Sequence, residues 1–206
     1  MTIHSCHALK VNFELNLVKC VVNSHYDELW GLSVGGGERE SSSFLTCGND
    51  RTLACWDTLS HTLVWSTLLD EPLRCVDMHP SLEVAALGLA TKNKWLVWDL
   101  RTRRTLFSQV EGGASGSNPA AIAAEHVEVI RFAPDGRQLA IGSRDNYIYV
   151  YSVSECGLKY ARIGRCSGHS SFITHLDWSR DSLFLMSNSG DYEVLAFDFL
   201  KAKRSL

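Results

Sequence analysis

The stretches GNDRTLACWD (residues 48–57), GSRDNYIYVYS (142–152) and NSGDYEVLAFD (188–198) share one frame, in which an aspartate is followed six residues later by a large aromatic side chain. The pairs are Asp50 with Trp56, Asp145 with Tyr151, and Asp191 with Phe197. A fourth stretch, ATKNKWLVWDL (90–100), fits at Trp98, with Lys92 in the aspartate position. The four aromatic positions lie 42, 53 and 46 residues apart. Self-similarity at such a period indicates a chain made of repeated structural units.

The local pattern within each repeat is that of short β-strands. Runs rich in β-branched and aromatic residues, such as FLTCG, LACWD and YIYVYSV, alternate with turn sequences such as Gly-Asn-Asp and Pro-Asp-Gly. No segment keeps an amphipathic helical period over three turns. A period near 40 to 45 with a Trp-Asp ending is typical of propeller blades. The sequence therefore predicts an all-β, WD-repeat β-propeller fold with about four blades.

The repeats predict the domain organisation. An N-terminal segment, 1–24, precedes a propeller region, 25–206, with repeats at about 25–70, 71–110, 125–167 and 168–198. The last repeat lacks an outer strand, and residues 13–22 form a spare outer strand before the first repeat. Because four blades is the low end of propeller sizes, we expect an open arc of a larger propeller. The Gly/Ser-rich insertions 35–43 and 111–124 are interpreted as flexible surface loops.

Composition excludes several function classes. The chain has 206 residues, of which 45% are hydrophobic and 21% charged, with a net charge of −3. This is a folded domain with no bulk attraction to nucleic acid or to an anionic membrane, and it has no apolar run long enough to span a bilayer. HSCH (4–7) has no second ligand pair at zinc-site spacing, so neither a metal nor a cofactor is predicted.

The stretch SGHSSFITHLDW (167–178) raises the question of catalysis, because it combines histidines, serines and an aspartate. In WD repeats, a histidine before the inner strand, a hydroxyl in the second strand, an aspartate in the next turn and a tryptophan in the third strand form one buried hydrogen-bonded chain. Such a chain gives each buried polar group a partner. The residues that fit this pattern are His25, Thr46, Asp50 and Trp56, then Asp145, and finally His169, Ser187 and Asp191.

A catalytic site would need a nucleophile, a base and an orienting acid in one cleft, which the sequence alone leaves open. The repeating frame favours the structural interpretation, since His169 relates to Asp191 as His25 relates to Asp50. In that frame, 173–178 is an inner strand. Strict alternation would place Ile173, His175 and Asp177 on one side of it.

Longer stretches resemble a known family. DELWGL (27–32), FLTCGNDRTLACWD (44–57), FAPDGRQLAIGSRDNYIYVYSV (132–153) and RCSGHSSFITHLDWSRDSLFLMSNSGDYE (165–193) are similar to the echinoderm microtubule-associated protein-like family. The resemblance covers about residues 25 to 198 and points to a fragment or a short isoform. It implies a WD-repeat protein of the cytoplasmic microtubule cytoskeleton. Such proteins have two joined propellers, a unit associated with tubulin binding.

The leading functional hypothesis is therefore a non-enzymatic interaction module with tubulin or microtubules as partner. The alternative is a scaffold in another complex, such as a ubiquitin-ligase substrate receptor, because fold alone does not fix function. Propellers contact partners through turns on one face. The candidate contact residues in those turns are Asp27, Glu28, Arg51, Arg144, Asn146, Ser170, Ser171, Phe172 and Tyr192.

Overall fold

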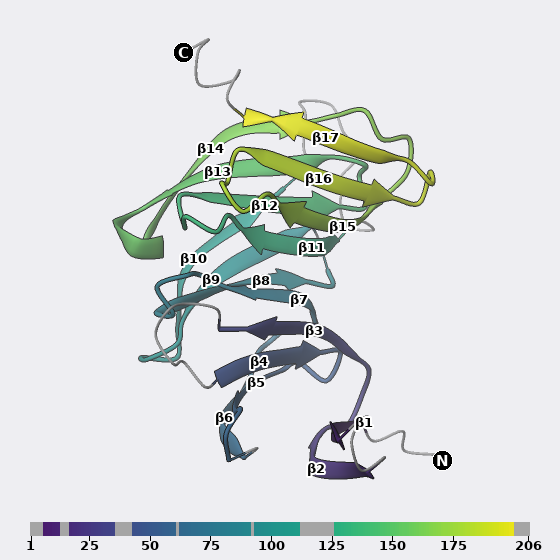
Figure 1. Cartoon of the computed structure of the whole chain (residues 1–206). Coiled ribbons are helices and arrows are strands. Elements are labelled where there is room, and N and C mark those ends of the chain that lie inside the picture. Colours follow the sequence, from purple (N-terminus) through teal and green to yellow (C-terminus); the bar gives the residue numbers. More distant parts are fainter. Residues whose placement is uncertain are drawn as a thin grey trace.

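The structure, a computed structural model, describes residues 6–12, 17–35, 43–60, 62–91, 93–111 and 126–199, with side chains described from His25 onward. These residues form fifteen strands in four antiparallel sheets, together with a separate two-stranded sheet. The predicted all-β class is confirmed, as is the open propeller arc (Figure 1). Among the described residues, no helix is long and apolar enough to cross a membrane.

The four sheets, here called blades 1 to 4, run in chain order from an inner to an outer strand. Blade 1 contains β3 (Leu29–Val34), β4 (Ser43–Gly48), β5 (Thr52–Asp57) and β6 (Leu63–Leu68). Blade 2 contains β7 (Leu73–Met78), β8 (Val84–Leu89), β9 (Lys94–Asp99) and β10 (Arg104–Val110). Blade 3 contains β11 (Val127–Phe132), β12 (Gln138–Ser143), β13 (Ile148–Ser154) and β14 (Lys159–Cys166), with a short 3-10 helix, Glu155–Gly157, before its last strand. Blade 4 contains β15 (Ile173–Trp178), β16 (Phe184–Ser189) and β17 (Val194–Asp198).

The inner strands β3, β7, β11 and β15 lie one above another and contact each other in that order (Figure 1). Blades 1 and 4 therefore stand at the two ends of the arc. Apolar side chains are exposed at both ends: Leu32 is 56% and Val34 63% exposed on blade 1, and Met186 is 51% and Val194 58% exposed on blade 4. This exposure follows from the open arc, since neither of these faces packs against another blade among the described residues.

The N-terminal segment differs from the expectation of a spare outer strand at 13–22. Residues 13–16 lie outside the described part of the chain, and the rest belongs to β2 (Leu17–His25). That strand pairs antiparallel with β1 (Cys6–Asn12) and joins none of the four blades. Blade 4 has three strands in the described chain.

Every inner strand carries a β-bulge near its start. The register shifts between Leu29 and Gly31, Leu73 and Cys75, Val127 and Val129, and Ile173 and His175. A bulge inserts one residue and interrupts the alternation of side chains. The predicted alternation in the last inner strand therefore holds from His175 to Trp178 and is wrong at Ile173, before the bulge. Ile173 is buried with Leu176 and Trp178, whereas His175 and Asp177 are exposed.

The core consists of three clusters, each between two consecutive blades. Leu45 of blade 1 and Leu87 of blade 2 belong to the first cluster, Trp95 and Ile141 to the second, and Ile148 and Leu185 to the third. All of these side chains except Ile148, at 1%, are 0% exposed. Each sheet is thus stabilised by its neighbours and not by a core of its own.

Glycine allows this close stacking at the penultimate position of the second strand. A Cβ on Gly142 would lie 2.6 Å from Ile173 Cγ2 and 2.7 Å from Val129 Cγ1. Gly88 of blade 2 occupies the equivalent place, 2.7 Å from Val127 Cγ1 of the following blade. The inner strand of the next blade therefore leaves no room for a side chain at either site.

We predict that Gly142→Ala lowers the free energy of unfolding by about 1–3 kcal/mol, because the added methyl group overpacks the contact between blades 3 and 4. Gly164→Ala is the matched control, since no atom lies within 4 Å of its Cβ position and a change within about 0.5 kcal/mol is expected there. Urea unfolding of both variants measures the difference. Equal stability of the two variants would contradict the packing role.

Candidate functional site

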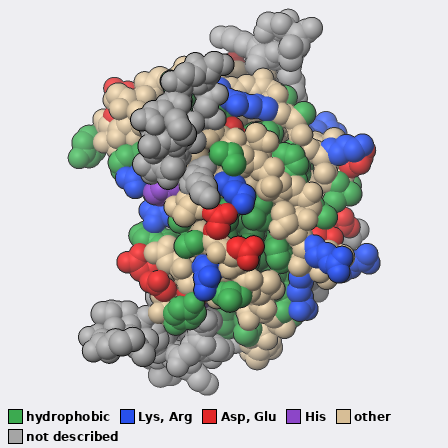
Figure 2. All heavy atoms as spheres, turned by 180° about the vertical axis from the view of Figure 1, so that it is seen from behind, with side chains coloured by type: hydrophobic (Ala, Val, Ile, Leu, Met, Phe, Trp, Pro, Cys, Tyr) green, Lys and Arg blue, Asp and Glu red, His purple; other side chains and the backbone are tan. Residues whose placement is uncertain are grey.

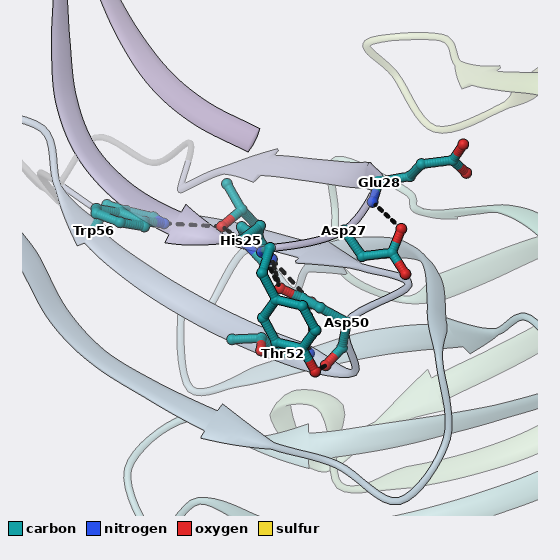
Figure 3. Close-up of polar contacts among 8 residues, drawn as sticks. His25, Asp27, Glu28, Asp50, Thr52 and Trp56 are labelled. Carbon is teal, nitrogen blue, oxygen red and sulfur yellow. Dashed lines mark hydrogen bonds and ion pairs between the residues drawn. The ribbon is translucent and has the colours of Figure 1, made fainter. Parts of the chain in front are cut away.

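In blade 1 the structure brings His25, Thr46, Asp50 and Trp56 together. Figure 3 labels His25, Asp50 and Trp56 of this group. His25 Nδ1 lies 3.0 and 2.9 Å from the two carboxylate oxygens of Asp50. His25 Nε2 lies 2.9 Å from Thr46 Oγ1, which accepts the Trp56 Nε1–H at 2.9 Å. The four residues form one continuous chain from the β4–β5 turn to the middle of the blade.

The chemistry of the groups fixes the direction of these bonds. An ionised carboxylate only accepts, so His25 donates from Nδ1 and its neutral Nε2 accepts the Thr46 hydroxyl proton. Asp50 also accepts the backbone N–H groups of Tyr26, at 3.2 Å, and Thr52, at 2.9 Å. Every polar group of the chain has a partner, as burial requires, since Trp56 is 1% exposed and Asp50 2%.

Blade 4 repeats the arrangement without its last member. His169 Nδ1 lies 3.0 Å from Asp191 Oδ2, and His169 Nε2 lies 2.6 Å from Ser187 Oγ. Phe197 stands where Trp56 stands in blade 1 and has no N–H to donate, so this chain ends at Ser187. Burial acts to raise the pKa of Asp191. Hydrogen bonds from the backbone of Glu193 and Ser170 and from His169 outweigh burial and hold this pKa well below its ordinary value.

The hydroxyl, imidazole and carboxylate groups of blade 4 follow one another as in a catalytic triad, but a substrate has no access to the hydroxyl group. Ser187 is 1% exposed, so a substrate carbonyl could not reach its Oγ. Ligand atoms of His169, Asp191 and Glu193 lie within 4.8 Å of one another, the one such group found in the described chain. Both nitrogens of His169 already bond within the blade, so the geometry accounts for this group without a metal.

Asp145 of blade 3 takes part in a different network. Its carboxylate accepts the N–H of Tyr147 at 3.1 Å, the hydroxyl of Tyr149, and Asn93 Nδ2 of blade 2 at 3.1 Å. Ser143 Oγ donates back to Asn93 Oδ1 at 2.9 Å. The aspartate that caps a turn in blade 1 thus also links two blades here. The sequence frame missed Asn93, because it compares positions within a repeat and not between repeats.

Glu111 is a second residue that the sequence analysis missed. The insertion 111–124 was expected to be a flexible surface loop, but Glu111 is 0% exposed, and residues 112–124 lie outside the described chain. Its Oε1 accepts Trp95 Nε1–H at 3.0 Å and the hydroxyl of Tyr151. Its Oε2 lies 3.5 Å from Arg162 Nη1. A carboxylate at the end of β10 therefore joins blades 2 and 3.

The candidate contact residues lie in turns at one edge of the blades, here called the turn face. Topology places them there, because the start of an inner strand, the turn after the second strand and the end of an outer strand share one edge. Six of these side chains are exposed: Asp27, Glu28, Arg51, Arg144, Ser170 and Tyr192. The other three are partly buried: Asn146, Ser171 and Phe172.

The turns of this face have a repeated backbone. Arg51, Asn93, Asn146 and Tyr192 each follow the aspartate position and have φ values of 65°, 48°, 70° and 66°. A left-handed residue is uncommon outside glycine, asparagine and aspartate, so Tyr192 is held there by the turn and projects outward, 98% exposed. Seen from behind, acidic, basic and hydrophobic side chains are interspersed over the surface without a field of one sign (Figure 2).

Comparison with known proteins places this geometry in context. The family model described as the echinoderm microtubule-associated protein second beta-propeller matches residues 29–205. The chain is 51% identical over 178 residues to human echinoderm microtubule-associated protein-like 3. This match covers 86% of the chain and 18% of that relative. It is 46% identical over 175 residues to human echinoderm microtubule-associated protein-like 1, and this match covers 85% of the chain and 20% of that relative. The chain thus spans about a fifth of the length of these curated relatives.

We predict that Thr46→Val lowers the free energy of unfolding by about 1–3 kcal/mol, because the Trp56 N–H loses its acceptor and His25 Nε2 its donor. Thr67→Val on β6 is the control, since no side-chain hydrogen bond of Thr67 exists among the described residues. In a Trp56→Phe background the same substitution should cost less. Chemical unfolding of the four variants measures this coupling. Strictly additive stability losses for Thr46→Val and Trp56→Phe would show that the two residues are not joined by the hydrogen bond.

Glu111→Ala should lower the free energy of unfolding by at least about 3 kcal/mol, because it leaves Trp95, Tyr151 and Arg162 without their buried partner. Glu155→Ala removes an exposed acid paired with Lys159 and should cost no more than about 1 kcal/mol. Thermal unfolding compares the two variants. A loss of the same size at both sites would show that Glu111 does not join the blades.

Proposed function

The chain belongs to the echinoderm microtubule-associated protein-like family, and from this premise we propose that it is a non-enzymatic interaction module that binds tubulin or microtubules. The observation that carries the proposal is the match of 29–205 to the family's second propeller. The names of the relatives describe those proteins as microtubule-associated. We extend that association to this chain and place its action at the cytoplasmic microtubule cytoskeleton.

The turn face is the proposed contact surface. Arginine and aromatic side chains are the commonest anchors of protein interfaces, and this face carries both. Arg144 Cζ lies 4.7 Å from the ring centroid of Phe172, so the stack holds the guanidinium group in place across blades 3 and 4. Tyr192 projects freely from blade 4. A partner would therefore gain two well-placed anchors at this end of the arc.

A role without catalysis agrees with the burial of the triad-like groups. Thr46 and Ser187 point into blades, and their hydroxyl groups serve Trp56, His25 and His169. No cofactor, nucleic acid or membrane enters the proposal. The ubiquitin-ligase alternative is not carried forward, because no feature of the relatives supports it.

We expect the purified chain to co-sediment with polymerised microtubules in a saturable manner. Tyr192→Asn, in which the new residue tolerates the left-handed turn, should weaken binding about fivefold or more, because it removes an aromatic anchor. Arg144→Gln should act in the same direction. Arg137→Gln, an exposed arginine in the β11–β12 turn at the opposite edge, serves as control. A chain that stays in the supernatant and retains no tubulin in a pull-down would overturn the proposal.

A further inference from the structure

The inner strands present two rows of side chains along the inner wall of the arc, and each row crosses all four blades. Because the bulges are equivalent, the first row is Trp30, Arg74, Glu128 and Thr174. By the same register, the second row is Ser33, Asp77, Arg131 and Asp177. Neither row follows from the repeat frame, because the side chains at equivalent positions differ in kind. The first row holds an aromatic ring, a cation, an anion and a hydroxyl group, and the second holds a hydroxyl group, two anions and a cation.

Within the first row, neighbours bind one another across the blade boundaries. Arg74 Cζ stands 3.6 Å from the ring centroid of Trp30. Arg74 Nε donates to Glu128 Oε2 at 2.8 Å. The other carboxylate oxygen, Oε1, lies 3.0 Å from His126 Nε2 and 3.6 Å from Arg144 Nε. One carboxylate is thus surrounded by two guanidinium groups and an imidazole.

The second row adds a further guanidinium group. Asp77 accepts Ser33 Oγ–H at 3.0 Å and the Phe132 N–H at 2.7 Å. Arg131 Nη1 donates to the carbonyl of Ile130 at 3.0 Å and lies 3.9 Å from Asp77. Burial raises the pKa of Asp77, because water is replaced by protein around the carboxyl. Arg131 is therefore only weakly paired with an acid of its own wall.

A cavity of about 270 Å³ lies on this wall and is lined from all four inner strands. Its charged lining residues are Arg74, Arg131 and Glu128, and His175 and Trp30 also border it. The side chain of Glu128 is 9% exposed, whereas that of Arg74 is 22% and that of Arg131 38% exposed. The acid is covered and the two cations face the opening, so the accessible charge of the cavity is positive. Asp177 is not among the residues that line it.

The guanidinium group of Arg74 is positioned before any ligand arrives. Arg74 uses Nε for Glu128 and its ring face for Trp30, and its Nη atoms have no acceptor among the described residues. Stacking and the Nε bond fix the guanidinium plane. A fixed planar fork with free N–H groups matches a carboxylate in a bidentate arrangement and loses little side-chain entropy on binding.

We propose that this cavity binds an acidic segment of a partner protein, with side-chain carboxylates on Arg74 and Arg131 and an apolar contact on Trp30. The inference rests on the proposed function, because it names the chemistry with which a protein partner would enter the arc. A peptide fits better than a small anion, since the cavity extends over four strands and offers two separate guanidinium groups beside Trp30, a residue that is 45% exposed.

The test is fluorescence anisotropy of the full chain with a labelled glutamate-rich dodecapeptide, at low and at physiological ionic strength. The same peptide with glutamine in place of glutamate is the matched probe. We expect binding of the glutamate peptide alone, weakening as salt rises. Arg131→Gln and Arg74→Gln should each weaken it about tenfold, the size of one lost charge-assisted hydrogen bond. Glu128→Gln should strengthen it, because the competing internal carboxylate is removed.

Arg137→Gln, outside the cavity, should leave peptide affinity unchanged, and thermal unfolding of each variant shows whether Arg74→Gln still folds. Arg131→Gln keeps the Arg74–Glu128 pair and so tests the site even if Arg74→Gln does not fold. Equal binding of the glutamine peptide, or an unchanged affinity in Arg131→Gln, would overturn the proposal. So would binding of a phosphoserine peptide or inorganic phosphate without binding of the glutamate peptide.

The two proposals can fail separately. Tubulin retained by a chain that does not bind the glutamate peptide would leave the proposed function standing and remove the acidic-segment site. Arginine-dependent peptide binding by a chain that retains no tubulin would support the acidic-segment site and remove the proposed function.

Discussion

The contact between consecutive inner strands is the constraint on which the rest of this structure depends. A four-stranded sheet with apolar side chains on both faces needs a neighbour on each face. Gly88 and Gly142 let the next inner strand approach to van der Waals contact, and the three core clusters form at these contacts. Blades 1 and 4 have a neighbour on one face, which is why apolar side chains are exposed at both ends of the arc.

The buried polar chains show how one repeated device changes when a single member is replaced. In blade 1, Thr46 joins His25 to Trp56. In blade 2, Leu87 occupies the hydroxyl position by register, and the buried Trp98 Nε1 has no partner in the described chain. In blade 3, Tyr151 replaces the tryptophan and bonds to Glu111 from the preceding blade. The hydroxyl group of Tyr151 thus has its partner in another blade, whereas the Trp98 N–H has none in the described chain.

Two surfaces with different chemistry follow from this architecture. The turn face carries the proposed contact residues, of which Tyr192 is the most exposed. The inner wall carries Arg74, which is held by Trp30 and Glu128, and Arg131, which bonds to the carbonyl of Ile130. A partner that uses both would contact the arc at its edge and along its inner side. The turn face consists of turns and strand ends on a sheet scaffold, where binding residues are commonly placed, whereas the inner wall consists of the inner strands themselves.

The sequence by itself determined the strands, the repeat frame and the members of the hydrogen-bond chain in blade 1, because each depends on residues at fixed offsets within one repeat. The aspartate and the aromatic residue are six positions apart in three of the four repeats, as Asp50 and Trp56 are in the first. Only the tertiary structure decided the burial of Glu111, the link from Asn93 to Asp145 and the row from Trp30 to Glu128. These contacts join different blades, and their geometry depends on how closely and in which register the sheets stack, which no spacing along the chain encodes.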